Sequence, residues 1–224
     1  MTPSACGAMA PFSVWTGGID RVPLVDALRA ALADGHSRNI DMLPGDTRDP
    51  RISGDIVLAP AAVLVAVTDR SDPGLILTQR ASSLRKHAGQ VALPGGRVDH
   101  TDSDEIAAAL REAQEEIALP ADQVQVIGTS DRYHTFTGFD IVPVLGVVPP
   151  DLPLVPQADE VADWFEAPLA FVLDPRNRIR KSAIFEGVER HYYEIFWQDR
   201  RIWGVTAAIL ANLSRRLGFD DASA

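Results

Sequence analysis

Cysteine is almost missing from this chain of 224 residues, since Cys6 is the only one. A single cysteine excludes a framework of internal disulfides and is typical of a reducing compartment. No apolar run approaches the roughly 20 residues that a membrane-spanning helix needs. The first basic residue is Arg21, so the N-terminus lacks the basic region of a secretory signal. We therefore expect a cytoplasmic protein with no membrane partner.

Basic residues are also scarce, with 21 Lys and Arg against 31 Asp and Glu and a formal net charge of −10. Contacts along a nucleic-acid backbone need clustered Lys and Arg, so this charge argues against nucleic acid as the main partner. An acidic enzyme that acts on a small polyanion must instead neutralise its substrate locally, with a metal ion and a few arginines. The hydrophobic fraction of 46% is enough for one sizeable core.

The pattern of apolar runs divides the chain into two parts. Residues 1–54 are predicted to form an accessory segment, with a helix that ends near Gly35 and a polar, irregular loop from His36 to Gly54. Residues 55–224 are predicted to form the main domain. Its expected strands cover residues 61–67, 75–79, 90–93, 124–128, 141–148 and 191–197, and a last helix covers 206–217. The continuous apolar strands favour a sheet covered on both faces, in an α/β or α+β domain.

The most informative stretch runs from Leu84 to Leu119. It predicts a strand from Gln90 to Leu93, a Pro-Gly-Gly turn, and a helix from about Ser103 to Ile117. Asp102, with Glu105 three residues on, is placed to cap this helix. At about 100° per residue, an apolar stripe should form its buried side. The residues of that stripe are Ile106, Leu110, Ala113 and Ile117.

The same helix carries three glutamates at positions i, i+3 and i+4: Glu112, Glu115 and Glu116. Such carboxylates repel one another, and most acidic helix faces are simply solvated. Here the helix follows Gly95 and Gly96, whose bare backbone can approach a ligand and offer a carbonyl. Carboxylates with a backbone carbonyl are the hard oxygen ligands of Mg²⁺ or Mn²⁺. A metal site of this kind predicts phosphate chemistry, because the ion can polarise a phosphoryl oxygen and activate water.

Gly96, the sequence Arg-Glu-Ala-Gln-Glu-Glu at 111–116 and Leu119 together resemble the Nudix box. This box is the signature of hydrolases that cleave nucleoside diphosphates linked to another moiety. The chain departs from the pattern by one extra residue between Gly96 and Arg111, by Asp102 in place of a Glu, and by Ala118 in place of the Gly that usually closes the helix in a left-handed conformation. The resemblance implies the Nudix fold, a mixed sheet sandwiched between helices.

Residues 77–96 are similar to the extra motif of the coenzyme A diphosphatase branch, whose Nudix box has this longer loop with Asp. The substrate implied is coenzyme A or an acyl derivative, cleaved to 3′,5′-ADP and a phosphopantetheine product. The implied Mg²⁺ or Mn²⁺ ligands are Gly96, Glu112, Glu115 and Glu116. The catalytic candidates, one of which accepts the proton of the attacking water, are Glu112, Glu115 and Glu160. The implied substrate-binding residues are Arg80, Arg85, Gln90 and Arg97, and the structural residues of the motif are Gly95 and Arg111.

Other interpretations remain open from the residues. An arginine near carboxylates is more often a structural ion-pair member than a phosphate ligand, and Glu160 can equally begin a helix or turn before Trp164. The expected partner is a small nucleotide, and a homodimer is one expected assembly. ADP-ribose, a dinucleotide or a nucleoside triphosphate is the alternative substrate. A catalytically silent nucleotide-binding module is the alternative from another class.

Overall fold

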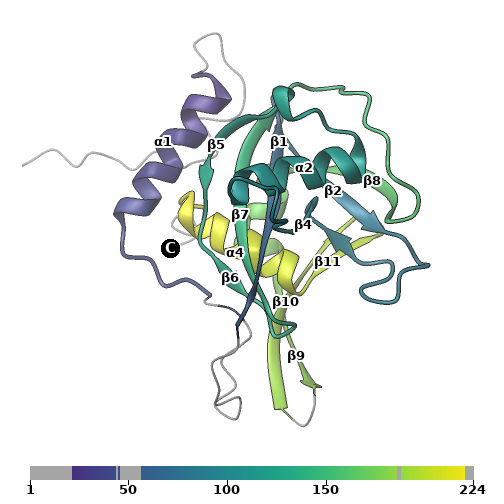
Figure 1. The fold of residues 1–224 in the computed structure, drawn as a ribbon. Coiled ribbons are helices and arrows are strands. Elements are labelled where there is room, and N and C mark those ends of the chain that lie inside the picture. The colour runs from purple at the N-terminus through teal and green to yellow at the C-terminus, as the bar shows by residue number, and fades with distance from the viewer. Residues whose placement is uncertain (1–21, 44, 46–56, 186–187, 220–224) are drawn as a thin grey trace, which may run out of the picture.

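The computed structural model describes residues 22–43, 45, 57–185 and 188–219 (Figure 1). Its helices are α1 (Leu24–Ser37), α2 (Glu105–Ile117), α3 (Leu169–Leu173) and α4 (Val205–Arg216), with 3-10 turns at Ala121–Gln123 and Pro175–Asn177. Its longer strands are β1 (Ala59–Thr68), β2 (Gly74–Arg80), β7 (Phe139–Val148), β8 (Val161–Pro168), β9 (Ile179–Phe185) and β10 (Val188–Trp197). The shorter strands are β3 (Val91–Ala92), β4 (Gly95–Arg97), β5 (Gln125–Thr129), β6 (Tyr133–His134) and β11 (Arg200–Trp203).

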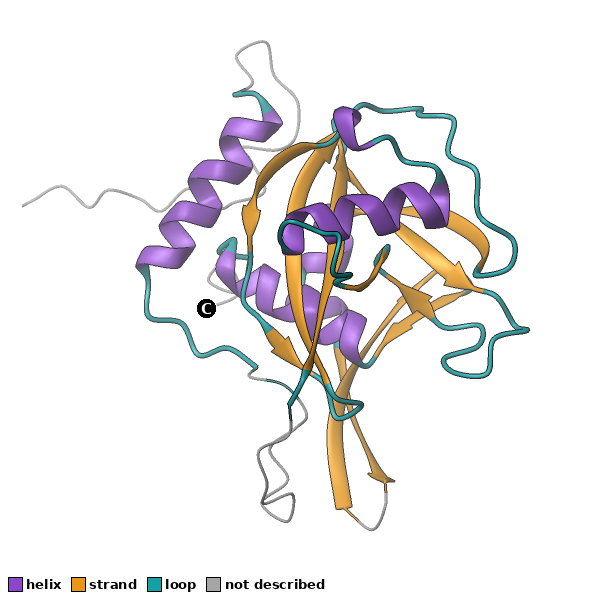
Figure 2. Ribbon diagram, in the orientation of Figure 1, coloured by secondary structure: helices purple, strands orange, loops and turns teal. Residues whose placement is uncertain are grey.

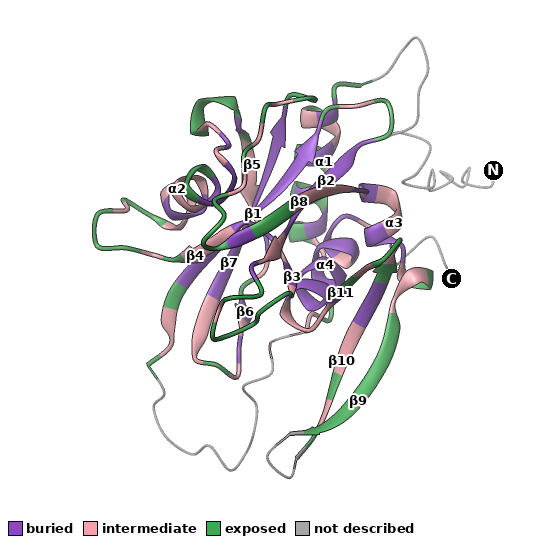
Figure 3. Cartoon of the chain, turned by 90° about the vertical axis from the view of Figure 1, so that its right-hand side faces the viewer, coloured by how far each residue is buried: buried purple, intermediate pink, exposed green. Residues whose placement is uncertain are grey.

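In the described part of the chain, β1 to β8 form one mixed sheet with the central order β3-β2-β1-β7-β5. β1 and β7 run parallel, in register from Ala59 opposite Phe139 to Thr68 opposite Val148. The other pairs are antiparallel, including β4 on β1 and β8 on β2. A second sheet, β11-β10-β9, carries a hairpin that projects from the body and exposes much of its surface (Figure 3).

The main sheet is covered on both faces, as its continuous apolar strands predicted. Along β1, Leu64 and Ala66 pack in the cluster that includes α2, whereas Val65 and Val67 pack in the cluster that includes α4. This alternation follows from the two-residue period of a strand. Helices therefore lie on both sides of the sheet (Figure 2). The predicted sandwich of a mixed sheet between helices is confirmed.

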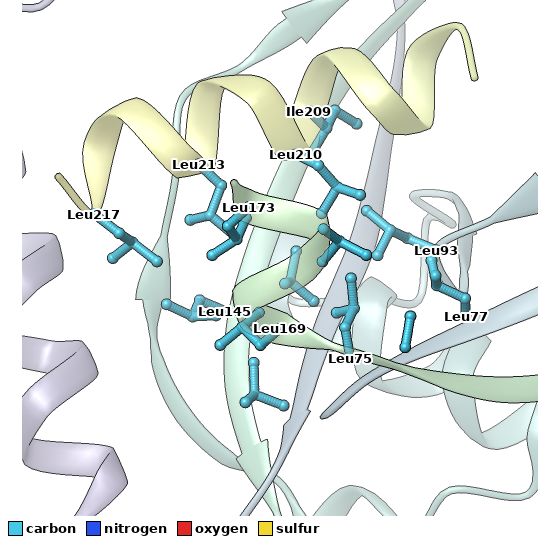
Figure 4. Packing of buried hydrophobic residues seen from close by; sticks show 14 of the residues in the cluster. Leu75, Leu77, Leu93, Leu145, Leu169, Leu173, Ile209, Leu210, Leu213 and Leu217 are labelled. Carbon is cyan, nitrogen blue, oxygen red and sulfur yellow. The ribbon is translucent and has the colours of Figure 1, made fainter. Parts of the chain in front are cut away.

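The larger cluster lies between the sheet and α4. Figure 4 shows leucines of α4 meeting side chains from α3, β2 and β7. Leu210 and Leu213 are almost fully buried there, as are Leu75 and Leu145. Burying a side chain of this size contributes about 2 kcal/mol of transfer free energy, so this layer holds β2 firmly in place. That matters for the site, because β2 leads directly into the loop of residues 81–90.

The helix predicted in the accessory segment is α1, and it packs on the main body. Leu24, Leu28 and Leu32 are buried in the same cluster as α4. Residues 38–43, which follow α1, have no regular structure, in agreement with the predicted loop. Most of the rest of that loop, residues 44 and 46–54, and the first two residues of the predicted main domain, 55 and 56, lie outside the described residues.

Every predicted strand is present, with ends that differ by a few residues. The Pro-Gly-Gly turn was wrong, because Gly95 and Gly96 belong to β4 and pair with β1. The sequence pattern missed β4, β6, β8, β9, β11 and α3. Among the described residues, no helix combines the length and the apolar character that a bilayer crossing requires.

Candidate active site

The catalytic candidates lie on α2, whose N-terminus differs from the prediction. Asp104, not Asp102, caps the helix, and its carboxylate accepts a hydrogen bond from the Ala107 N–H at 2.8 Å. The helix therefore begins at Glu105 rather than near Ser103. Asp102 accepts a hydrogen bond from the Asp99 N–H at 2.7 Å, so it closes the preceding loop.

Asp102 also holds Arg111 in a bidentate pair, with Nε–Oδ1 and Nη2–Oδ2 distances of 2.9 Å. The Arg111 Nη1 group donates to Glu112 and to Glu115, each at 3.0 Å. The Arg111 Nη2 group donates to the Arg97 carbonyl at 3.0 Å. One guanidinium thus ties two box glutamates to the loop, and the neighbouring carboxylates raise its pKa above its usual value. The Arg111 cation offsets the repulsion that spacing alone predicted for this face.

The buried side of α2 is turned from the predicted stripe. Ala113 and Ile117 are buried as expected, but Ile106 and Leu110 are only half-buried. Ala108 and Ala109 are buried instead, because their small side chains let the helix lie close to the sheet. The turned face carries Glu116 inward, with 4% of its surface exposed.

Glu116 is the buried carboxylate of the site. Its Oε2 accepts a long hydrogen bond from the Gly95 N–H at 3.3 Å, and its Oε1 lies 3.9 Å from Arg80 Nη1. Burial raises the pKa of Glu116 to about 7, and the charges of Glu112 and Glu160 add to the rise. The Gly95 hydrogen bond and the Arg80 charge counteract it only in part.

The two glycines of β4 allow this close approach. Gly95 has φ 155°, and a Cβ atom there would lie 2.3 Å from the Ala62 carbonyl oxygen. A Cβ atom at Gly96 would lie 2.5 to 2.6 Å from the Glu112 carboxylate. Any larger residue at either position would separate β4 from β1 or from α2. The glycine pair therefore sets the distance between the backbone of β4 and the box glutamates.

A cavity of about 500 Å³ opens beside Glu112 and Glu115. Its other charged or ionisable lining residues are Arg97, Asp99, His100 and Arg111. Glu112 is half-buried, and this burial raises its pKa, while Glu115 is exposed. Arg97 is exposed and lies over the Phe139 ring at 5.7 Å. The cavity is large enough for a small ligand.

Two further predicted residues lie near Glu116. Arg80 ends β2 and faces Glu116, as described above. Glu160 lies in the turn before β8, and its carbonyl accepts a hydrogen bond from the Ala81 N–H at 2.8 Å. Its charge raises the pKa values of Glu112 and Glu116, so the turn faces the box.

The other two predicted binding residues lie on the loop of residues 81–90. Arg85 is exposed, and Gln90 Oε1 lies 3.0 Å from His87 Nδ1. Gln90 lines a second cavity, which shares no residue with the one beside Glu112. The structure thus gathers Arg80, Arg97 and the glutamates around α2 and leaves Arg85 and Gln90 on the loop.

A comparison with family models matches the NUDIX domain to residues 58–186, more than half of the chain. The chain belongs to the Nudix family. A Nudix hydrolase NudL from Cronobacter sakazakii, described as uncharacterized, is 50% identical over 159 residues, which cover 70% of this chain and 82% of that protein. NudL of Escherichia coli K12, with the same description, is 46% identical over 159 residues, which cover 70% of this chain and 82% of that protein.

Among solved structures, an Ap4A hydrolase binary complex from C. elegans is 22% identical, with a TM-score of 0.43, over 49% of this chain and 80% of that one. The NUDIX domain of Shewanella oneidensis NrtR complexed with ADP ribose is 22% identical, with a TM-score of 0.41, over 63% of this chain and 85% of that one. As a Nudix hydrolase, the chain is a pyrophosphohydrolase that acts on a nucleoside diphosphate derivative, in a family that uses divalent metal ions.

The donor set of this Nudix site suits such an ion. Among the described residues, no three Asp, Glu, His or Cys side chains already converge as a metal cluster, because Arg111 holds Glu112 and Glu115 while Glu116 turns to Gly95. Glu116 nevertheless is a buried carboxylate with only a long hydrogen bond and a distant arginine to compensate its charge. A hard divalent cation would supply the missing compensation.

Sequence reasoning missed the link from Asp102 to Arg111 and the depth of Glu116. The sequence does contain a signal for the link between Asp102 and Arg111, because the family pattern places an acidic residue six positions after Gly96. The burial of Glu116 left no such signal, since it depends on which helix face meets the sheet.

Proposed function

We propose that the protein hydrolyses the pyrophosphate bond of coenzyme A or an acyl derivative, giving 3′,5′-ADP and (acyl-)4′-phosphopantetheine. One observation carries this proposal: the segment resembling the coenzyme A motif, residues 77–96, contacts the box glutamates at three points. Arg80 faces Glu116, the Gly95 N–H donates to Glu116, and Gly96 lies against Glu112. A substrate held by this segment is therefore presented to the same carboxylates.

In this proposal the metal ligands are Gly96, Glu112, Glu115 and Glu116. When bound, Mg²⁺ or Mn²⁺ polarises a phosphoryl oxygen and lowers the pKa of the attacking water. Arg111 positions Glu112 and Glu115, and Asp102 fixes Arg111 in turn. Gly95 and Gly96 keep the backbone of β4 close to this group of carboxylates.

The reaction itself needs one water and one proton acceptor. The water oxygen attacks one phosphorus of the diphosphate, the bond from that phosphorus to the bridging oxygen breaks, and the bridging oxygen leaves with the electron pair. A carboxylate among Glu112, Glu115 and Glu160 accepts the proton of the water. Glu160 suits this role because it is exposed and its charge reaches both Glu112 and Glu116.

The substrate phosphates require positive charge that is not already neutralised. In the described part of the chain, Arg85, Lys86 and Arg97 have no ion-pair partner, and all three are exposed. Arg97 borders the cavity beside the glutamates, and Arg85 lies on the loop that follows Arg80. We assign these two arginines, with Arg80 and Gln90, to substrate binding.

A product assay tests the proposed substrate. The purified protein with Mg²⁺ or Mn²⁺ is expected to release 3′,5′-ADP from coenzyme A with a kcat/KM at least tenfold above that for ADP-ribose. Arg85→Ala should raise the KM for coenzyme A by about tenfold, the loss of one charge-assisted phosphate contact. Arg29→Ala, remote from the site on α1, is the matched control. Efficient cleavage of ADP-ribose with no turnover of coenzyme A would contradict the proposed substrate but not the proposed role of the carboxylates.

A further inference from the structure

The loop of residues 149–160 joins β7 to β8 and is bonded to the end of α2. The Val155 N–H donates to the Ile117 carbonyl at 3.0 Å, and the Gln157 N–H donates to the Glu116 carbonyl at 2.8 Å. The last four carbonyls of a helix have no partner within the helix, so these bonds satisfy two of them. The loop is therefore fixed to the residue whose side chain is the buried carboxylate of the site.

Gln157 also begins the turn that carries Glu160. The Gln157 carbonyl accepts hydrogen bonds from the Glu160 N–H at 3.0 Å and from the Val161 N–H at 2.8 Å. Two backbone hydrogen bonds in series thus link Glu116 to Gln157 and Gln157 to Glu160. Gln157 is the residue through which the turn is joined to α2.

The far end of this turn is fixed to β2. Val161 is fully buried and pairs with Arg80 in the sheet. The Glu160 carbonyl accepts a hydrogen bond from the Ala81 N–H at 2.8 Å. Arg80 in turn lies 3.9 Å from Glu116. The turn is therefore bracketed by the two elements that meet at the buried carboxylate, α2 and β2.

The middle of the turn is held by the Gln157 side chain. Gln157 Oε1 accepts a hydrogen bond from the Asp159 N–H at 2.7 Å. A side-chain oxygen that accepts from the N–H two residues on is the pattern by which Asn and Asp stabilise turns. The side chain of Gln157 holds the peptide unit before Asp159, and its carbonyl holds the peptide unit before Glu160. Two successive peptide units that lead to Glu160 therefore depend on one residue.

The direction of the Glu160 side chain depends on this turn. Glu160 is exposed, and among the described residues its carboxylate has no hydrogen-bond or ion-pair partner. Its main chain therefore sets where the carboxylate points. A proton acceptor must lie within hydrogen-bond reach of the attacking water, and a misplacement of about 1 Å can lower a rate by about 100-fold.

We propose that Gln157 is a positioning residue for the hydrolysis, which holds the turn so that the Glu160 carboxylate is directed at the water beside the box glutamates. The inference rests on the proposed function, and it narrows the three candidates for the proton acceptor to Glu160. Gln157 acts through Glu160 and borders neither of the two cavities. Because Gln157 is exposed, its substitution removes the contact within the turn and leaves the core unchanged.

Steady-state kinetics of Gln157→Ala test the inference. Loss of the side-chain acceptor should lower kcat at least fivefold, the effect of one neutral hydrogen bond, and change KM less than twofold. Gln157→Asn can still accept from the Asp159 N–H and should recover most of kcat. Gln123→Ala, an exposed glutamine outside this loop, is the matched control and should leave both constants unchanged. Coenzyme A and ADP-ribose are both assayed, so a wrong substrate assignment does not affect this test.

A double-mutant cycle shows whether Gln157 acts through Glu160. Glu160→Gln keeps the size of the side chain but removes the proton acceptor, and it should lower kcat about 100-fold. Addition of Gln157→Ala to Glu160→Gln should then lower kcat by less than twofold further. Effects that multiply would overturn the inference and leave Glu160 as the proton acceptor. Full turnover by Glu160→Gln would overturn both the inference and that role of Glu160, while the substrate stays as the product assay finds it.

Amide hydrogen exchange gives a readout without turnover. With EDTA present, the Asp159 and Glu160 N–H groups should exchange at least fivefold faster in Gln157→Ala than in the wild type. The Val155 N–H, which donates to α2, should keep its rate, and Gln157→Asn should restore slow exchange in the turn. Unchanged exchange in Gln157→Ala would show that the turn does not depend on this side chain, and the inference would fail whatever the substrate.

Discussion

Glu116 is a buried carboxylate with little to compensate its charge. Its carboxylate is 4% exposed, and its partners are one hydrogen bond of 3.3 Å from Gly95 and one arginine at 3.9 Å. Since desolvation is the largest cause of its pKa of about 7, ionisation at higher pH works against folding. A cation at this position converts the same charge from a cost into a binding contribution.

This predicts a pH dependence of stability for the protein in EDTA. The pKa of Glu116 in the folded state is about 7, above the usual 4.5, so the folded state binds the proton of this carboxyl more tightly than the unfolded state does. The stability gained from the protonated Glu116 is therefore complete below about pH 4.5 and is lost as the pH rises through about 7. The free energy of unfolding should fall by up to roughly 3 kcal/mol over that interval from this group, at 1.36 kcal/mol per pKa unit. Urea unfolding at pH 5 and pH 8 measures it.

Glu116→Gln is the matched variant, because it keeps the shape and removes the titration. The difference in stability between the two proteins should therefore change with pH, in favour of Glu116→Gln at pH 8. Parallel stability curves for the wild type and the variant would show that Glu116 is not the destabilising charge.

At the scale of single residues, the sequence predicted which residues form the site better than it predicted how deeply each of them is buried. Spacing placed Glu112, Glu115 and Glu116 together, because three positions on one helix follow from the 3.6-residue period. Spacing could not tell that Glu116 turns inward, since that depends on how closely Ala108 and Ala109 let α2 approach the sheet. Whether these residues bind metal and substrate stays a prediction.

At the scale of elements, the C-terminus of α2 shows how a departure from the family pattern is accommodated. Ala118 adopts the left-handed conformation, φ 55° and ψ 31°, that the family's glycine would take without strain. Its N–H donates to the Ala113 and Gln114 carbonyls, so the helix still ends in the usual way. Ala118 therefore takes the left-handed conformation of the family's glycine at the cost of the strain that a Cβ atom brings to it.

Ala118→Gly should therefore stabilise the protein. Relief of about 1–2 kcal/mol of left-handed strain exceeds the roughly 0.5–1 kcal/mol of added unfolded-state entropy, which leaves a net gain of about 0.5–1 kcal/mol. Thermal or urea unfolding measures the gain. Ala107→Gly, within the same helix, is the control and should lose about 1 kcal/mol. A loss of stability in Ala118→Gly would show that the left-handed turn stores no strain.

Prediction of elements was best where periodicity was strong. The strands β1, β2, β7 and β10 and the helices α1, α2 and α4 follow from apolar patterns of strand or helix length. β4 and β11 were missed because they are short, and β8 because its burial alternates irregularly along Val161–Pro168. Gly95 and Gly96 read as a turn because their strand conformation comes from pairing with β1, a tertiary contact.

At the scale of the whole molecule, α1 is fastened to the main body through Arg216. This arginine, 8% exposed, pairs with Asp131 and donates to the Gly35 carbonyl at the end of α1. A second link joins the Leu43 backbone to the Asn212 side chain at 2.8 and 2.9 Å. We accordingly propose that α1 and residues 38–43, which lie in the predicted accessory segment 1–54, depend on their contacts with the main domain for their structure.

Arg216→Met should lower the free energy of unfolding by about 3–5 kcal/mol, because it leaves Asp131 without its cation and the Gly35 carbonyl without a donor. Arg29→Met breaks the exposed Arg29–Asp26 pair and should change stability by less than about 1 kcal/mol. Urea unfolding compares the two variants. Equal, small losses would mean that the Arg216 pair does not fasten α1 to the body.

The measurement that tests the central claim most directly is the rate of 3′,5′-ADP release from coenzyme A by Glu116→Gln at saturating Mg²⁺. If Glu116 is a metal ligand, this rate should fall at least 100-fold below that of the wild type, about 2.7 kcal/mol of lost transition-state stabilisation. Glu105→Gln, on the same helix but paired with Arg132 at 2.7 Å, should keep the wild-type rate. Full turnover by Glu116→Gln would contradict the metal assignment and with it the account of this site.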